Sequence, residues 1–121
     1  MFIEKAELIE KKSKFISYYY EIDSKDKVKI IIDELKQNNK KARHIVYAYK
    51  IGNTAGKTDD KEPSGTAGTQ IYNLIELNNL NNCLIVVVRY FGGTKLGAPL
   101  LARTYKNAAL KVIKQANEKL S

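Results

Sequence analysis

The apolar run from Leu84 to Val88, LIVVV, constrains the fold of this chain more than any other stretch. Apolar residues occupy both faces of a strand with this sequence, and most of them are β-branched. Such a strand lies inside a sheet and is covered by helices on at least one face. The run leads directly into RYFGGTKLG, Arg89 to Gly97, where two adjacent glycines end the strand. We therefore expect a central strand that is followed by a shaped loop.

Periodic patterns predict the remaining elements, because strands alternate with period two and helices repeat every three or four residues. In chain order they are strands over residues 2–10 and 15–22, a helix that starts from an N-cap at Asp23 or Ser24, a strand over 44–51, and helices over 70–77 and from Pro99 onward. The order β-β-α-β-α-β-α predicts an α+β fold. We expect a two-layer α/β sandwich in which helices cover one face of a four-stranded sheet.

Length and composition limit the other possibilities. A chain of 121 residues is expected to form a single domain over residues 1–121. The N-terminus MFIEKAELIE carries acids among its apolar residues, which is not typical of a secretion signal, and we expect a cytoplasmic location. The single cysteine, Cys83, has no partner for an intrachain disulfide and is expected to be a small buried apolar residue.

The net charge of +8 is compatible with an anionic partner such as RNA. A second explanation is a compositional bias, since 18 lysines and 10 asparagines accompany only 3 arginines. Arginine is the better bidentate ligand for phosphate. Charge alone therefore does not decide between the two explanations.

The segment TDDKEPSGTAG, from Thr58 to Gly68, combines three acids, a proline and two glycines, so it predicts a shaped loop rather than a core element. Functional residues concentrate on such loops. Our candidate binding residues lie in this loop, in the segment after the central strand and in the following helix: Asp59, Asp60, Glu62, Ser64, Gly65, Thr66, Arg89, Tyr90, Gly92, Gly93, Lys95 and Arg103.

Four segments together resemble the N-terminal domain of the IMPACT/YigZ family: SKFISYYYEI, ARHIVYAYKIG, DDKEPSGTAG and VVVRYFGGTKLG. The resemblance covers about residues 1–118. It implies a fold like the second domain of ribosomal protein five of the small subunit, and a role in translation regulation. It also suggests that the strands at 44–51 and 84–91 run parallel, so that loops 52–68 and 92–98 leave one sheet edge. We expect this chain to lack the ferredoxin-like second domain that is usual in bacterial members.

We expect a non-enzymatic module that contacts RNA, the ribosome or a translation-regulating protein through these two loops. The alternative for Arg89 is a structural clamp on the loop acids. A further alternative is a small hydrolase, or a metal- or anion-binding enzyme, that uses Asp59, Asp60, Glu62 and Ser64, although loop-shaping by these side chains competes with it. We assign no catalytic residue, cofactor or metal ligand, and we expect no membrane partner.

Two further interpretations concern particular atoms. We expect one of two arrangements for residues 64–68. Either their N–H groups form a nest that binds an anion, or the segment is a tight loop that packs against Gly92 and Gly93. The only histidine, His44, begins its strand about 23 Å from Ile51, at roughly 3.3 Å per residue. A Ser64–His44 pair is not expected, because it requires the long loop to fold back along the sheet.

Overall fold

The structure, a computed structural model, describes residues 1–120. Five strands form one sheet in the order β1-β2-β5-β3-β4, and every neighbouring pair is antiparallel. The elements are β1 (Phe2–Glu10), β2 (Ser13–Glu21), α1 (Asp26–Asn38), β3 (His44–Ile51), β4 (Thr54–Thr58), α2 (Gly68–Leu77), β5 (Cys83–Tyr90) and α3 (Ala98–Leu120). The predicted central strand is β5, which lies in the middle of the sheet and is buried from Cys83 to Arg89.

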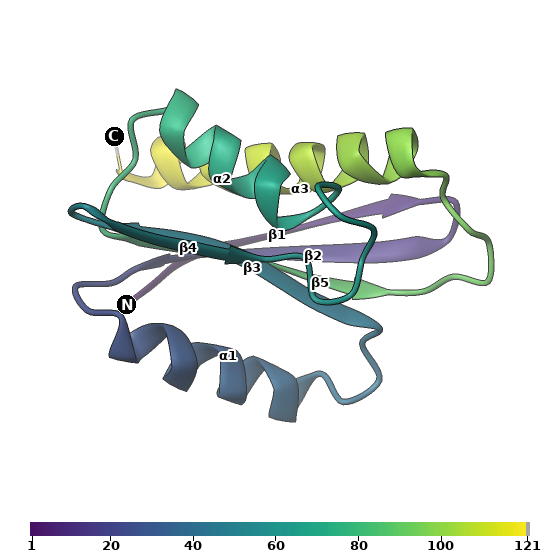
Figure 1. Cartoon of the computed structure of the whole chain (residues 1–121), viewed down its shortest axis with the longest axis horizontal. Helices are drawn as coiled ribbons and strands as arrows, with labels where there is room; N and C mark the ends of the chain where they lie inside the picture. The colour runs from purple at the N-terminus through teal and green to yellow at the C-terminus, as the bar shows by residue number, and fades with distance from the viewer. Residues whose placement is uncertain (121) are drawn as a thin grey trace.

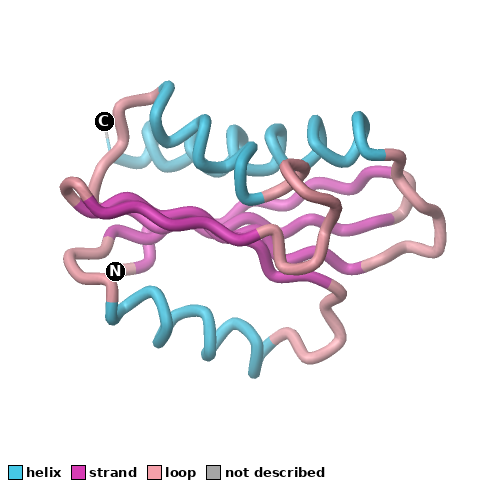
Figure 2. The backbone as a smooth tube through the Cα atoms, in the orientation of Figure 1, coloured by secondary structure: helices cyan, strands magenta, loops and turns pink. Residues whose placement is uncertain are grey.

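Helices cover both faces of the sheet, with α1 on one face and α2 and α3 on the other (Figures 1 and 2). The α+β fold is confirmed, but the prediction of helices on one face only is wrong. The reason is that the inner strands are apolar on both faces. In β5, Leu84, Val86 and Val88 face the core under α1, whereas Ile85 and Val87 face the core under α2 and α3.

The sheet has five strands, and the strand that the sequence did not predict is β4. Gly52, with a φ of +57°, turns the chain after β3, and β4 then pairs antiparallel with β3 from Thr54 to Thr58. Because β4 reverses the chain, α2 begins at the end of the sheet where β3 began. The expectation that β3 and β5 run parallel is therefore wrong, since His44 pairs with Arg89 in an antiparallel register.

The first helix also departs from its predicted start. The N-cap position of α1 is Lys25, and no side chain caps the helix. Ser24 contributes its carbonyl oxygen, which accepts from the Lys27 amide at 3.3 Å.

None of the helices in residues 1–120 combines the length and apolar character that crossing a lipid bilayer requires.

Side chains of α3 cover the outer edge of β1. The Lys111 ammonium donates to the carbonyl oxygen of Glu7 at 2.6 Å, Gln115 to that of Lys5 at 3.1 Å, and Lys119 to that of Ile3 at 2.8 Å. The three donors are spaced four residues apart on the helix, and the three acceptors are alternate residues of the strand. An edge strand that is occupied in this way is a poor template for pairing with another chain.

We expect the thiol of Cys83 to be unreactive in the native protein. Cys83 is 1% exposed, and burial raises the pKa of its thiol from 9.0 to about 11. At pH 8 the group is a neutral thiol out of reach of solvent, and thiolate is the reactive form. A chromogenic disulfide reagent at pH 8 should label Cys83 only after denaturant is added; rapid stoichiometric labelling of the folded protein would contradict this.

The same burial predicts how stability depends on pH. Deprotonation of Cys83 is easier in the unfolded chain, so its contribution is complete below pH 9 and is lost as pH rises toward 11. Burial likewise raises the pKa values of Tyr19 and Tyr20 to about 12. The melting temperature should therefore fall between pH 9 and 12, and less steeply in a Cys83→Ala variant.

Candidate functional site

The two predicted loops lie at the same end of the sheet, toward the right in Figure 1. One is the loop over residues 59–67, between β4 and α2, and the other is the segment over 91–97, between β5 and α3. They meet because β4 and β5 both end there, and not because β3 and β5 are parallel. The turn between β1 and β2 and the start of β3 complete this end of the molecule.

The centre of this end is a buried ion pair between Glu62 and Arg89. Arg89 Nη1 donates to Glu62 Oε1 at 3.0 Å and to Oε2 at 2.8 Å, and the two side chains are only 4% and 6% exposed. The hydroxyl of Tyr105, on α3, donates to Glu62 Oε2. Burial, together with the adjacent carboxylate, raises the pKa of Tyr105, so its phenol keeps the proton that it donates. The clamp interpretation of Arg89 is thus confirmed.

Arg89 also has nitrogen atoms that Glu62 does not use. Its Nε is buried and has no hydrogen-bond partner among the described residues. The guanidinium lies 5.5 Å from the ring centroid of Phe15 and 6.0 Å from that of Phe91. Aromatic faces attract a guanidinium, and they offset part of the cost of burying it.

His44 contacts the acidic loop from the start of β3. Its Nδ1 lies 2.7 Å from the carbonyl oxygen of Asp60, which can only accept, so Nδ1 carries a proton. Its Nε2 lies 3.3 Å from Glu62 Oε1. The loop reaches His44 because β4 returns along β3, which is the fold-back that the sequence did not predict. His44 therefore contacts Asp60 and Glu62, and it makes no hydrogen bond to Ser64 among the described residues.

The carboxylate of Asp59 accepts from three of the five N–H groups that the sequence assigned to a possible anion nest. Asp59 Oδ2 accepts from the Gly65 amide at 3.1 Å, and Oδ1 accepts from the amides of Ala67 and Gly68 at 3.2 and 2.8 Å. A carboxylate at the first turn of α2 satisfies free N–H groups and favours the helix dipole. The loop thus supplies its own anion.

Asp60 ties the loop to β3. Asp60 Oδ2 accepts from the Ile45 amide at 2.7 Å, and the backbone at Asp60 and Lys61 has φ values of 44° and 69°. Thr66 is buried and donates to the carbonyl oxygen of Pro63 at 2.6 Å, whereas Ser64 is exposed. All three acids that a hydrolase site would use thus make hydrogen bonds within the protein.

The segment after β5 packs directly on the turn between β1 and β2. A Cβ at Gly92 would lie 2.2 Å from the carbonyl carbon of Lys12, and the Gly92 amide donates to Ser13 Oγ at 3.2 Å. Gly93 has a φ of 91°, which favours glycine. The hydroxyl of Tyr90 donates to Asn39 Oδ1 at 2.5 Å, so Tyr90 braces the end of α1.

Exposed basic side chains surround this internally paired centre, and we call their surface the basic end. Its residues are exposed, and none makes an ion pair among the described residues: Lys11, Lys12, Lys41, Arg43, Lys61, Lys95 and Arg103. Of these, only Lys95 and Arg103 were among the predicted site residues. The others come from turns before β2 and β3 and from the acidic loop, and only the fold shows that these segments meet.

Phe91 adds an aromatic ring to the basic end. It is 37% exposed, and the guanidinium of Arg43 lies 4.7 Å from its ring centroid. The Arg43 amide donates to the carbonyl oxygen of Arg89 at 2.8 Å, which fixes the start of β3 beside the end of β5. The sequence indicated this pair only weakly. Arg43 precedes the strand that begins at His44, and it lies 46 positions before Arg89 in the sequence.

Comparison with solved structures defines the class of domain to which this fold belongs. A crystal structure described as that of a hypothetical protein has a TM-score of 0.89 and 28% identity, and the match covers 93% of this chain and 57% of that one. The two-domain translational regulator Yih1 has the same fold, with a TM-score of 0.62 at 24% identity over 95% of this chain and 46% of that one. The chain is thus an antiparallel α+β domain with the fold of these two structures.

The sequence matches the Impact N-terminal domain over residues 11–113, and the chain belongs to the IMPACT family. IMPACT family member YvyE of Bacillus subtilis (strain 168) is 36% identical over 102 residues, which are 82% of this chain and 47% of that protein. YigZ of Escherichia coli (strain K12) is 30% identical over 87% of this chain and 54% of its own length. This chain thus spans about half the length of these relatives.

Proposed function

We propose that this chain is a non-enzymatic, translation-associated binding module whose basic end binds RNA. The observation that carries the proposal is the separation of charge at this end. The three loop acids are engaged within the protein, whereas seven exposed basic residues have no acidic partner in the described part of the chain. The association with translation is supported by the likeness of this fold to that of Yih1, a two-domain translational regulator.

The chemistry of the basic end suits single-stranded or looped RNA. Lysine and arginine side chains neutralise phosphates, and the binding energy that they supply decreases as salt concentration rises. An exposed aromatic ring beside an arginine offers a surface on which an unpaired base stacks. Phe91 with Arg43 is such a pair, and it lies among the lysines of the basic end. The residues proposed to contact RNA are Lys41, Arg43, Phe91, Lys95 and Arg103.

A charge-reversal variant tests the proposal. The Lys41→Glu/Lys95→Glu variant should bind a fluorescent RNA stem–loop at least tenfold more weakly than the wild type at about 50 mM salt. The slope of log affinity against log salt should also become shallower by roughly 0.7–0.9 for each lost phosphate contact. Fluorescence anisotropy between about 50 and 200 mM salt measures both quantities.

The control is the Lys25→Glu/Lys57→Glu variant, which changes the net charge by the same amount at the start of α1 and on β4. It should retain wild-type affinity for the stem–loop. Phe91→Ala should cost about 1–3 kcal/mol if a base stacks there. Equal weakening by both double variants would mean that net charge, and not this surface, attracts RNA. No binding by the wild type to the stem–loop or to ribosomes would refute the RNA proposal.

A further inference from the structure

The two edges of the sheet differ in how they are protected. The outer edge of β1 is covered by Lys111, Gln115 and Lys119. The outer edge of β4 has no such cover, since residues 54–57 pair only with β3 and make no other hydrogen bond within the described chain. Thr54, Ala55 and Lys57 are exposed. The free N–H and C=O groups of alternate β4 residues are therefore available to another strand.

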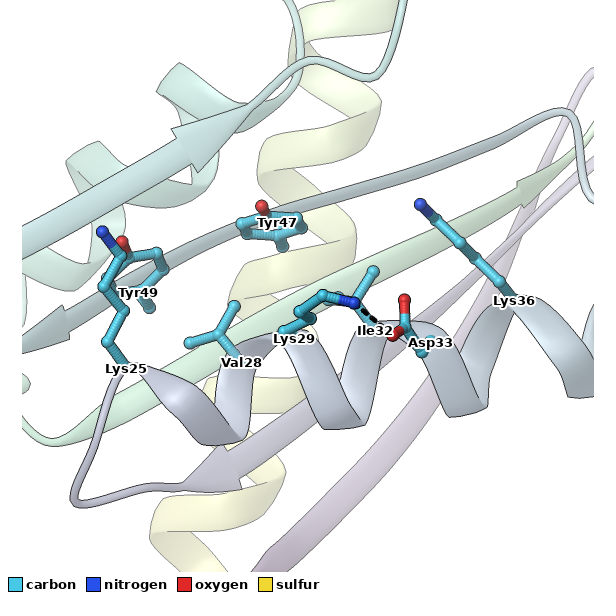
Figure 3. A pocket seen from close by; sticks show the side chains of 8 residues that line it. All are labelled: Lys25, Val28, Lys29, Ile32, Asp33, Lys36, Tyr47 and Tyr49. Atoms are coloured by element: carbon cyan, nitrogen blue, oxygen red, sulfur yellow. Dashed lines mark hydrogen bonds and ion pairs between the residues drawn. The ribbon is translucent and has the colours of Figure 1, made fainter.

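A hollow lies beside this edge on each face of the sheet. On the α1 face, a groove of about 380 Å³ separates α1 from β3 (Figure 3), with Val28, Ile32, Tyr47 and Tyr49 among its lining residues. On the α2 face, a hollow of about 270 Å³ is lined by residues 55–57 and Tyr72. A strand added to β4 would direct successive side chains alternately toward these two faces.

The contact between Tyr49 and Gly56 extends the groove to the edge strand. A Cβ at Gly56 would lie 2.6 Å from the ring of Tyr49, so the ring lies directly over the glycine. The ring of Tyr47 is stacked with it, with centroids 6.4 Å apart and an angle of 27° between the planes. The two stacked rings connect the groove to β4, and Tyr49 is the buried one of the pair.

The charged side chains that line the two hollows and make no ion pair among the described residues are basic. Lys25 and Lys36 extend from α1 toward β3 and make no ion pair among the described residues (Figure 3). The one acid of the groove, Asp33, is paired with Lys29 at 2.9 Å. On the other face, Lys57 lies 5.4 Å from the ring centroid of Tyr72. An occupant of this edge therefore needs acidic side chains beside apolar or aromatic ones.

We propose that the β4 edge binds an extended acidic segment of a partner protein as a sixth strand. Backbone hydrogen bonds to β4 supply affinity, and side chains that alternate between the groove and the hollow supply selectivity. A second copy of this chain is a poor occupant, because pairing of two β4 edges brings Lys57 and the α1 lysines of both copies together. The partner is thus an acidic peptide of different sequence.

Selection from a phage-displayed library of random nine-residue peptides tests this inference. Selected peptides should be enriched in aspartate and glutamate, with apolar or aromatic residues between them. A synthetic selected peptide should bind Lys25→Glu/Lys57→Glu at least tenfold more weakly than wild type. It should bind the Lys41→Glu/Lys95→Glu variant normally, so each double variant is the control for the other proposal.

N-methylation of the peptide separates strand addition from simple charge attraction. Methyl groups on one alternate set of peptide amides should abolish binding, and those on the other set should have little effect, because only one set faces β4. Equal effects of the two sets, selection of no acidic pattern, or NMR shift changes away from β4 and its groove would overturn the proposal. So would a dimer that forms through β4 in the absence of peptide.

Discussion

Replacing Glu62 with glutamine will lower the melting temperature of this protein by more than about 10 °C. The substitution removes the charge that faces Arg89 and leaves the guanidinium buried without a counterion. Loss of one partner of a buried ion pair costs about 3–5 kcal/mol. For a chain of this size, each kcal/mol corresponds to roughly 3–5 °C. Thermal unfolding followed by circular dichroism measures the change.

Two variants make this expectation specific to the buried pair. Glu76→Gln removes an exposed carboxylate that Lys50 contacts at 3.0 Å, and it should leave the melting temperature nearly unchanged. The double variant Glu62→Gln/Arg89→Met removes both charges and should be more stable than Glu62→Gln alone. The single variant Arg89→Met completes the comparison. If the destabilisation of the double variant equals the sum of those of Glu62→Gln and Arg89→Met, the ion pair is not the source of the effect.

Replacing Gly92 with alanine will destabilise the protein by about 3 kcal/mol or more, because the new methyl group meets backbone and not a side chain. Its Cβ would lie 2.2 Å from both the carbonyl carbon and the oxygen of Lys12, and 2.6 Å from the Ser13 amide. Overpacking costs typically about 1–3 kcal/mol, and more where the neighbours cannot move. Denaturant titration measures the loss.

The matched control is Gly97→Ala, in the same segment. Its nearest neighbour, Pro99 Cδ, would be 4.0 Å from the added Cβ, and the effect on stability should be within about 0.5 kcal/mol. Gly92→Ala should also weaken RNA binding, since it displaces the segment that carries Phe91 and Lys95. Similar stability of the two alanine variants would contradict the close packing of Gly92 on this turn.

Periodic patterns predicted most of the secondary structure because the core residues recur at regular spacing. The strand predicted over residues 44–51 is β3, from His44 to Ile51, and the helical stripe from Leu101 to Ala116 is buried along α3. β4 escaped prediction because its sequence TAGKT has no apolar alternation, so its pairing with β3 is set by the turn at Gly52 and not by burial. Without this hairpin, the path from β3 to α2 and the relative direction of β3 and β5 could not be inferred correctly.

The roles of the site residues were predicted less completely. Pairing of Arg89 with a loop acid follows from residue types alone, but the choice of Glu62 depends on where the loop crosses the sheet. The meeting of His44, Glu62 and Tyr105 joins three elements that are far apart in sequence, and no local pattern encodes it. Five of the seven residues of the basic end were missed for the same reason, since they lie in separate turns and loops: Lys11, Lys12, Lys41, Arg43 and Lys61.

The cover on β1 has a consequence for synthesis of the chain. Lys119 contacts Ile3, and the two residues are 116 positions apart, so β1 is protected by residues that leave the ribosome long after it. Until α3 is released and docks, the edge of β1 stays open to pairing with other nascent chains. Translation through α3 is thus the step at which this side of the sheet ceases to be a hazard for aggregation.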